Sequence, residues 1–393
     1  MQAIVLAAGR GTRMGTLSDT IPKPLLPVAG ESIVEHVLGA ATTGGARELI
    51  VVTGYQESAV REALGEEHNG VPITYVTQPE VNGTASAVKA ALEHVDGPFA
   101  VLNGDCVFTG KDLAALFEAA PSIGVYEVED PREYGVVSMN GTYVEGIIEK
   151  PDNPPSHLAN AGAYVFPDDG QVTLDVEQSE RGEYEITDAV RTLVENWNVS
   201  AIELDAWMDV GYPWELLEAN ERILGQQPCS LDGSVHSEAE LSGNVVVAET
   251  ATVREGTVIE GPVRIDEHAT VGPNAYIRGS TMIGAGAEVG HGAEVKNSIV
   301  MEHAKIPHIS YVGDSIIGPR VNLGAGTTIA NLRHDEECIK VTVKGERVST
   351  GRTKFGAIIG ANVKTGINTA INPGVTLSAG SCTYPGETVE TDR

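Results

Sequence analysis

The sequence lacks paired cysteines and long hydrophobic runs. Its four cysteines (Cys106, Cys229, Cys338 and Cys382) are scattered and form no CxxC pair, which argues against a disulfide framework or a zinc site. The first apolar run, Ala3 to Ala8, is too short for a signal segment or a membrane span, and no later run is long enough. We therefore expect a cytoplasmic protein whose thiols are buried or incidental.

Positive charge is also scarce. Lysine and arginine number 26 against 55 acidic residues, which gives a formal net charge of −29. Nucleic acids and anionic membranes would be repelled by such a chain, so neither is expected as a partner. The acidic residues are spread along the sequence, as on a solvated acidic surface. A high-salt cytoplasm is our hypothesis, because salt screens self-repulsion.

The chain length and a change in composition predict two domains. A chain of 393 residues exceeds one ordinary domain. Near residue 225 the helix-like segment PWELLEANERIL ends, and GQQPCSLDGS has the composition of a linker. We predict a first domain over 1–224, a linker over 225–234 and a second domain over 235–393.

The second domain carries a six-residue repeat. Nine aliphatic residues follow one another at this interval: Val247, Val253, Ile259, Ile265, Val271, Ile277, Ile283, Val289 and Val295. A small or branched residue stands four positions after each, and nine consecutive matches exclude chance. The repeat slips near Ile306, resumes at Ile317, and returns after a loop at Ile359. Such a period predicts a parallel β-helix with one aliphatic ladder stacked inside.

The first domain alternates predicted strands with predicted helices. Short apolar runs at 2–8, 48–53, 73–76 and 99–102 are separated by helix-like stretches such as 32–42 and 57–64. This alternation predicts an α/β domain with a mostly parallel sheet. The stretch LAAGRGTRM (6–14) then lies at the carboxyl edge of the first strand, where open α/β sheets bind ligands.

The glycine–arginine stretch favours a phosphate ligand. It satisfies neither the dinucleotide fingerprint nor the P-loop pattern. Two glycines still let the backbone approach a phosphate closely, and Arg13 with Lys23 supplies positive charge. The alternative is a structural glycine turn with surface arginines. Asp105 at a strand end and Asp209 before a helix are more often capping residues when alone, but together they predict a Mg²⁺ site.

These segments together resemble the sugar-1-phosphate nucleotidylyltransferases. LAAGRGTRM, PKPLLPVAG, GTASA, NGD, EYGVV, IIEKP, NAGAYVF and MDVGYP follow in family order over residues 1–224. The resemblance implies a Rossmann-like nucleotide-binding domain with four groups of residues. Leu6, Ala8, Gly9, Gln78 and Gly83 would hold the base and ribose; Gly11, Arg13 and Lys23 the triphosphate; Gly135, Glu149, Lys150 and Asn160 the sugar phosphate; and Asp105 and Asp209 the Mg²⁺. Ser86 departs from the histidine of bacterial uridylyltransferases, which leaves uracil and thymine both open.

The second domain resembles the left-handed β-helix of hexapeptide-repeat acyltransferases over residues 235–390, which implies a homotrimer. Residues 307–335 resemble the acetyltransferase half of bifunctional N-acetylglucosamine-1-phosphate uridylyltransferases. This likeness implies His308 as catalytic base, Tyr311, Asn322 and Asn331 as substrate-binding residues, and Arg278 and Lys296 as phosphate-binding residues. The basic loop 339–354, which begins near Lys340, suits an anionic ligand such as a sugar phosphate or coenzyme A. Pairing of its cations with acidic neighbours is the alternative.

Two enzymatic activities are therefore expected. In the first, UTP and a sugar 1-phosphate would give a nucleotide sugar and pyrophosphate, with Mg²⁺, Arg13 and Lys23 offsetting the developing charge. In the second, His308 would assist acetyl transfer from acetyl-CoA to an amino-sugar phosphate. Two alternatives stay open: a glucose-1-phosphate uridylyl- or thymidylyltransferase whose β-helix only assembles or regulates, and a binding module with a decayed site.

Overall fold

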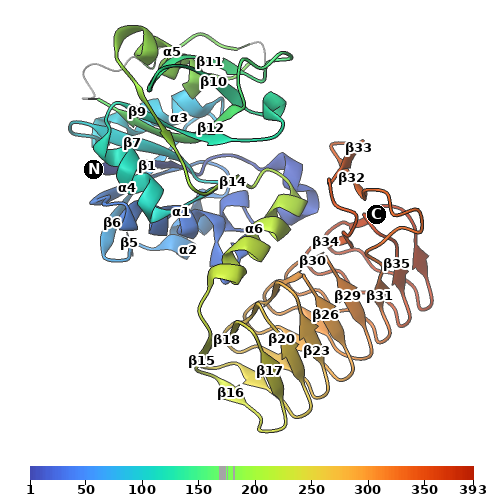
Figure 1. Ribbon diagram of the computed structural model, residues 1–393. Helices are drawn as coiled ribbons and strands as arrows, with labels where there is room; N and C mark the ends of the chain where they lie inside the picture. Colours follow the sequence, from blue (N-terminus) through green and yellow to red (C-terminus); the bar gives the residue numbers. More distant parts are fainter. Residues whose placement is uncertain (168–173, 175, 180–181) are drawn as a thin grey trace. The chain divides into compact units, whose positions relative to one another are not determined.

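The computed structural model describes residues 1–167, 174, 176–179 and 182–393, and the chain forms two compact units (Figure 1). Unit 1 comprises Met1–Arg10, Pro22–Leu25 and Ser32–Asp209. Unit 2 comprises Gly11–Ile21, Leu26–Glu31 and Val210–Arg393. Two short early segments thus belong with the carboxyl-terminal part of the chain. The domain boundaries expected from sequence stay a prediction.

A mixed sheet forms the centre of unit 1. Its strands β6 (Val71–Thr77), β4 (Glu48–Thr53), β1 (Gln2–Leu6) and β7 (Phe99–Asn103) are adjacent and parallel, which confirms the four predicted strands. Beyond β7 the sheet changes direction, because β12 (Leu158–Phe166) runs antiparallel to β7 and to β9 (Ser122–Glu127). The outer strands are β10 (Gly135–Asn140), β11 (Tyr143–Glu149), β13 (Ser200–Glu203) and β5 (Glu67–His68).

Helices cover both faces of this sheet. Because side chains alternate along a strand, Val5 and Ile4 of β1 belong to two separate apolar cores. Helices α1 (Ile33–Thr43), α2 (Glu57–Leu64) and α4 (Gly110–Glu118) pack into the core that contains Val5. Helices α3 (Thr84–Ala91) and α5 (Ile186–Asn196) pack into the other. This is the α/β arrangement that the alternating sequence pattern predicts.

Unit 2 contains three parallel sheets whose strands succeed one another in rotation (Figure 1). The first sheet holds β15 (Ser230–Leu231), β18 (Val245–Val247), β21 (Val263–Ile265), β24 (Thr281–Ile283), β27 (Ile299–Val300), β30 (Ile316–Ile317), β34 (Ile358–Ile359) and β36 (Thr376–Leu377). The second holds β16 (Ser234–Val235), β19 (Thr252–Val253), β22 (Thr270–Val271), β25 (Glu288–Val289) and β28 (Lys305–Ile306). The third holds β17 (Glu240–Ser242), β20 (Val258–Glu260), β23 (Tyr276–Arg278), β26 (Glu294–Lys296), β29 (Tyr311–Gly313), β31 (Thr328–Ile329), β35 (Ala370–Ile371) and β37 (Thr388–Val389). This rotation fits a parallel β-helix.

We call the part of unit 2 that the three sheets form, residues 230–393, the coil. The predicted aliphatic ladder fills its interior. All nine residues of the uninterrupted series are at most 1% exposed, from Val247 to Val295. The later members Ile317, Leu323, Ile329, Ile359, Ile371 and Leu377 are buried in the same core. One antiparallel hairpin, β32 (Lys340–Val343) with β33 (Glu346–Ser349), interrupts the repeat. The ladder expected from the six-residue period is therefore confirmed.

The remaining segments of unit 2 lie against the coil. They include the 3-10 segment η1 (Thr12–Leu17), strand β2 (Pro27–Val28) and helix α6 (Pro213–Gln226). The Asn220 side chain of α6 accepts a hydrogen bond from the Ala29 backbone N–H at 2.9 Å and donates to the Ser280 carbonyl at 2.8 Å. The Thr16 hydroxyl accepts from the Ala379 N–H at 2.9 Å. Among the described residues, no helix has the length and apolar character needed to cross a membrane.

Candidate active sites

A cavity of about 250 Å³ opens at the carboxyl ends of the parallel strands in unit 1. Its lining consists of Leu6, Ala8, Gly9, Gln78, Val81, Gly83, Thr84, Ala87, Asn103, Asp105 and Glu183. All five residues expected at the base and ribose are in this set, together with the predicted metal ligand Asp105. The structure thus brings together predicted residues as far apart in sequence as Leu6 and Asp105.

Gly83 shapes this cavity because no other residue fits its position. Its φ is +136°, and a Cβ there would lie 2.4 Å from the Tyr184 nitrogen and 2.3 Å from the Tyr184 oxygen. The Ala85 N–H donates to the Tyr184 carbonyl at 2.9 Å, and the Tyr184 N–H donates to the Asn82 carbonyl at 2.9 Å. The loop that starts α3 is therefore held against the segment at Tyr184.

The side-chain amide of Gln78 has a fixed orientation in this cavity. Gln78 is 4% exposed, and its Nε2 donates to the Gly83 carbonyl at 3.0 Å and to Ser86 Oγ at 2.7 Å. A carbonyl oxygen can only accept, so the amide nitrogen must face Gly83. Oε1 of Gln78 is left as an acceptor. An acceptor at this point suits a base that carries a ring N–H.

The two predicted metal ligands lie together because two short strands pair. Strand β8 (Cys106–Phe108) pairs antiparallel with β14 (Trp207–Asp209), and Asp209 lies opposite Cys106. One ligand atom from each of Asp105, Cys106 and Asp209 lies within 4.8 Å of the others. Burial, then the charges of Asp209 and Asp105, raise the pKa of the Cys106 thiol well above its usual range. The oxygens of the two carboxylates, and not the thiol sulfur, match the ligands that Mg²⁺ prefers.

Lys23 lies beside these carboxylates. Its Nζ is 2.6 Å from Asp105 Oδ2, and the lysine side chain is 11% exposed. Burial opposes the charged form of the lysine, but the charges of Asp105 and Asp209 outweigh burial and raise its pKa. Lys23 is thus a cation held next to the predicted metal position.

The residues expected at the sugar phosphate also lie near one another. Gly135 of β10 pairs with Glu149 of β11, and a Cβ on Gly135 would lie 3.1 Å from Glu149 Oε2 and 3.4 Å from Asn160 Cβ. Asn160 Nδ2 donates to the Tyr164 hydroxyl at 2.7 Å. Lys150 follows directly on Glu149, and its Nζ is 3.7 Å from Glu133 Oε2. The two remaining triphosphate candidates, Gly11 and Arg13, belong to unit 2, where the Arg13 guanidinium lies 5.3 Å from the Tyr212 ring centre.

Most residues expected to bind the acetyl acceptor lie on the third sheet of the coil. Register pairs Arg278 with Lys296, and Glu294 with Tyr311, on successive turns. Asn331 follows β31, and its Nδ2 donates to the Tyr311 hydroxyl at 3.2 Å. Arg278 forms an ion pair with Glu294 at 2.8 Å. Four of the predicted residues thus share one face.

His308 and Asn322 lie away from this face. His308 occupies the corner between β28 of the second sheet and β29 of the third, and its side chain is exposed. Asn322 continues the second sheet, bridging in parallel to Lys305 and to Lys364. Within one chain the structure therefore does not bring Asn322 to Lys296 and Tyr311.

The basic loop is partly committed to structure. Arg352 pairs with Glu221 of α6, and Arg347 donates to the carbonyls of Lys340 and Gly374. Lys340, Lys344 and Lys354 are exposed. Of the five cationic residues of this loop, the two arginines make these structural contacts. The three lysines do not take part in them and are the candidates to bind an anionic ligand.

Comparison with known proteins covers the whole chain. Residues 2–226 match the nucleotidyl transferase family, and residues 259–355 match the GMPPB C-terminal domain. The chain is 39% identical over 401 residues to the bifunctional sugar-1-phosphate nucleotidylyltransferase/acetyltransferase of Sulfurisphaera tokodaii, covering all of this chain and 98% of that relative. The chain belongs to this bifunctional family.

Other relatives support the same membership. The bifunctional protein GlmU of Methanococcus maripaludis strain C7 is 41% identical over 387 residues, covering 97% of this chain and 92% of the relative. The UTP–glucose-1-phosphate uridylyltransferase AglF of Haloferax volcanii is 36% identical over 235 residues, or 57% of this chain and 96% of that relative. As a member of this family, the chain is an enzyme, and its relatives are named for combined nucleotidylyltransferase and acetyltransferase activities.

Several residues at these sites were not expected from the sequence. Asn103 lines the nucleotide cavity, and its buried Oδ1 has no hydrogen-bond partner in the described part of the chain. Glu294 and Asp314 contact the expected acetyl-site residues. Asn103 and Asp314 belong to the sequence segments NGD and YVGD. A single polar residue at or after the end of a strand does not by itself predict which residues it contacts.

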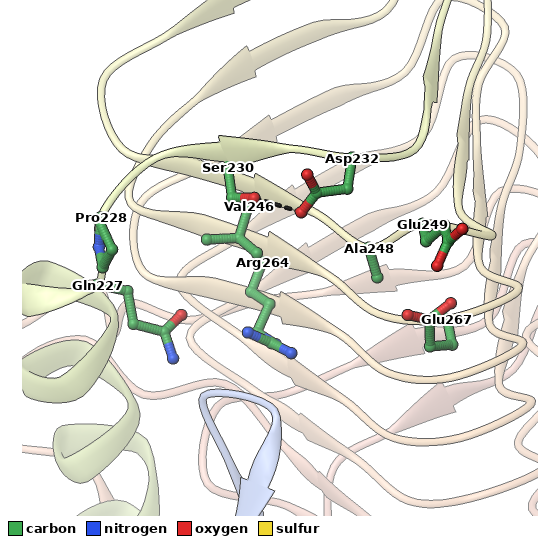
Figure 2. A pocket seen from close by; sticks show the side chains of 9 residues that line it. All are labelled: Gln227, Pro228, Ser230, Asp232, Val246, Ala248, Glu249, Arg264 and Glu267. Carbon is green, nitrogen blue, oxygen red and sulfur yellow. Dashed lines mark hydrogen bonds between the residues drawn. The ribbon is translucent and has the colours of Figure 1, made fainter.

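A larger cavity lies elsewhere, where the chain enters the coil. It measures about 500 Å³, and its lining includes Gln227, Asp232, Glu249, Arg264 and Glu267 (Figure 2). The Arg264 guanidinium forms an ion pair with Asp266 at 2.5 Å. No candidate residue of either reaction lines this cavity, so its size alone does not make it an active site.

Proposed function

We propose that this chain makes UDP-N-acetylglucosamine in two reactions. The coil would transfer the acetyl group of acetyl-CoA to glucosamine 1-phosphate. The α/β unit would transfer the uridylyl group of UTP to N-acetylglucosamine 1-phosphate, with Mg²⁺ and release of pyrophosphate. The observation that carries the proposal is the joint lining of one cavity by Gln78, Gly83 and Asp105 beside Asp209 and Lys23.

The carboxylate pair fits Mg²⁺. This ion prefers oxygen ligands and is held in proteins by one or two carboxylates together with substrate phosphates. Asp105 and Asp209 supply such oxygens, whereas the sulfur of Cys106 is a soft ligand that Mg²⁺ does not favour. When bound, the metal would neutralise charge on the phosphates.

The uridylyl step needs positioning and charge stabilisation more than covalent chemistry. Gln78 would accept the ring N–H of the base, and the glycine loop at Gly9 would let the backbone approach the nucleotide. The sugar-phosphate oxygen attacks the α-phosphorus in line, a bond to that phosphorus forms, and the bond to the leaving pyrophosphate breaks. Lys23 and Arg13 would offset the negative charge on the transferring and leaving groups.

The acetyl step would use His308 as general base. Its exposed imidazole would accept a proton from the substrate ammonium, and the resulting amine nitrogen would attack the thioester carbonyl. The C–N bond would form, the C–S bond would break, and the leaving thiolate would take the second proton of the nitrogen, so that coenzyme A leaves as the thiol. Arg278 and Lys296 would hold the phosphate, and Tyr311 and Asn331 the sugar. Lys340, an exposed residue of β32, would bind an anionic part of the substrates.

The second reaction would take place in a homotrimer of left-handed coils. Asn322 lies on a different sheet from Lys296 and Tyr311, so a second copy of the chain would have to present it to the same substrate. The ligands we propose are small molecules. The net negative charge of the chain disfavours a nucleic acid or an anionic membrane as a partner on electrostatic grounds. Sedimentation of the full chain tests the trimer, and a monomer that acetylates its substrate would contradict it.

A second candidate function keeps the first reaction and removes the second. This candidate is a glucose-1-phosphate uridylyl- or thymidylyltransferase with a coil that would only assemble or regulate, and the relative from Haloferax volcanii, which matches 57% of the chain, supports glucose 1-phosphate and UTP as substrates to test. A substrate panel separates the two. It crosses UTP and dTTP with the 1-phosphates of glucose, glucosamine and N-acetylglucosamine, and it measures pyrophosphate and free coenzyme A thiol.

The variant Asp105→Ala adds a control to this panel. We expect it to abolish pyrophosphate release and to leave acetyl transfer intact, because thioester aminolysis needs no phosphate-bridging ion. Turnover of glucose 1-phosphate with no release of coenzyme A would establish the second candidate. Loss of both activities in a folded Asp105→Ala protein would contradict the assignment of two separate sites.

A further inference from the structure

A buried aspartate lies beneath the candidate residues of the acetyl-transfer face. Asp314 follows β29 at the corner that leads to β30, has a φ of +48°, and is 2% exposed. A carboxylate taken out of water is stable only where donors replace its hydration. The donors around Asp314 therefore indicate what this residue does.

Three side chains from the two turns that flank Asp314 donate to this carboxylate. Lys296 Nζ lies 2.7 Å from Oδ2, and Asn297 Nδ2 lies 2.9 Å from Oδ1. Asn331 Nδ2 also donates to Oδ2. The first two come from the turn before Asp314 and the third from the turn after it. The carboxylate thus connects side chains of the two turns on either side of its own.

Two of these donors are candidate substrate residues, and a third candidate is held through one of them. Asn331 Nδ2 donates to the Tyr311 hydroxyl as well as to Asp314. Gly313 leaves room for this contact, since a Cβ there would lie 2.6 Å from the Tyr311 hydroxyl and 2.7 Å from Asn331 Nδ2. Lys296, Tyr311 and Asn331 are therefore connected through one buried carboxylate.

The arrangement leaves the lysine able to bind an anion. A lysine ammonium carries three N–H donors, and its long stem gives it no fixed position without a partner. The Lys296 side chain is 18% exposed, whereas that of Asp314 is 3% exposed. Asp314 thus holds the ammonium from the buried side, and a ligand can reach it from the exposed side.

The support extends outward from Asp314 through Asn297. Asn297 Nδ2 donates to Glu221 Oε1 at 2.7 Å as well as to Asp314, and Glu221 pairs with Arg352. Neither Asn297 nor Glu221 is among the expected substrate residues. Both are therefore available for variants that disturb Asp314 and leave the substrate residues in place.

We infer that Asp314 is a positioning residue for the acetyl-transfer reaction, which fixes Lys296 and Asn331 for the acceptor's phosphate and sugar and does not itself touch the substrate. The inference rests on the proposed acetyl transfer. A displacement of about 1 Å at such residues costs about a hundredfold in rate. Asp314 acts on the acceptor side, so its loss should leave acetyl-CoA binding unaffected.

The experiment compares Asp314→Asn with the wild-type chain. The amide keeps the size of the side chain but turns an N–H toward one of the three donors. We expect kcat/KM for acetyl transfer to fall by about ten- to a hundredfold, with a raised KM for glucosamine 1-phosphate and an unchanged KM for acetyl-CoA. Uridylyl transfer should be unchanged. Equal rises in both KM values would overturn the inference.

A double-mutant cycle with Lys296→Met separates positioning from general stability. If Asp314 acts through the lysine, Asp314→Asn should cost much less in the Lys296→Met background than alone. If the two substitutions lowered kcat/KM independently, so that their fold-changes multiplied, Asp314 would have a merely structural role. The matched control is Asp266→Asn, which weakens a different, partly buried ion pair of the coil, that with Arg264, away from the candidate residues, and it should leave acetylation unchanged.

Two further results keep the outcomes distinct. Asn297→Gly removes one of the side chains that donate to Asp314, and glycine readily adopts the left-handed φ of +46° at this position. This variant tests the inference if Asp314→Asn does not fold. We expect a smaller rise in the same acceptor KM, and wild-type kinetics would overturn the inference. If the wild-type chain acetylates nothing, the proposed function fails; if it acetylates and Asp314→Asn equals it, only the inference fails.

Discussion

The contact between Lys23 and Asp105 predicts that this lysine competes with a metal ion. The ammonium lies 2.6 Å from Asp105 Oδ2, an oxygen that Mg²⁺ would use. Lys23→Met removes the charge and keeps an unbranched side chain of comparable length. In the absence of nucleotide, the variant is expected to bind a divalent cation more tightly than the wild-type chain, because Asp105 no longer has to give up its partner.

The size of this effect follows from the contact. A hydrogen bond to a charged group contributes about 1.5–3 kcal/mol. The Asp105 side chain is 36% exposed, so water already screens part of the attraction, and the lower half of that range applies. A gain near 1.5–2 kcal/mol corresponds to roughly ten- to thirtyfold in affinity.

Binding of Mn²⁺, followed by electron paramagnetic resonance on nucleotide-free protein, measures this gain. Pyrophosphate release by the same variant should fall, because the leaving group loses a stabilising charge. The control is Lys111→Met, which breaks a pair with Asp205 on the exposed surface of the same unit and should leave Mn²⁺ affinity unchanged. Unchanged or weaker Mn²⁺ binding by Lys23→Met would refute the competition.

Three other expectations concern the coil and the surface. His308→Ala should lower the rate of acetyl transfer by about a hundredfold or more. The melting temperature and the rate of uridylyl transfer should stay unchanged. If both activities fell together, the histidine would have a structural role. Ile277→Ala, at a fully buried ladder position, should lower the free energy of unfolding by about 2–5 kcal/mol, measured by urea denaturation. The control Thr252→Ala, at an outward position, should leave that free energy almost unchanged. With a net charge of −29, the melting temperature should rise from low to molar salt, and a flat or falling curve would exclude the high-salt hypothesis.

The periodic features of the fold could be predicted from the sequence. A six-residue repeat places each aliphatic residue at an equivalent point of a turn, so burial of Ile259, Ile277 and Val295 follows from spacing alone. The strands at 48–53 and 99–102 were likewise predictable, because runs of apolar residues bounded by polar ones have few other structures.

Contacts between distant segments carry no such period. Nothing in the spacing of Thr16 and Ala379, or of Glu221 and Arg352, indicates that they meet, and these contacts join early segments and α6 to the coil. The excess of cations in 339–354 predicted a ligand, but Arg352 neutralises a carboxylate that lies far away in sequence. Motifs placed Asp105 and Asp209 at one site, whereas the pairing of β8 with β14 that joins them had no sequence signal.

The lengths of the turns of the coil set where this protein can gain or lose sequence. Tyr276 pairs with Glu294 across a step of 18 residues, while Glu294 pairs with Tyr311, and Tyr311 with Thr328, across steps of 17. Turns of 18 residues repeat the same ladder positions, so duplication or deletion of one between residues 245 and 288 would preserve the register of the ladder. The shorter turns carry Lys296, His308, Tyr311, Asp314 and Asn322 and have no equivalent elsewhere in the repeat. We therefore expect the coil to tolerate a change of length in the regular turns and not in the shorter ones, which carry the candidate residues of the acetyl-transfer reaction.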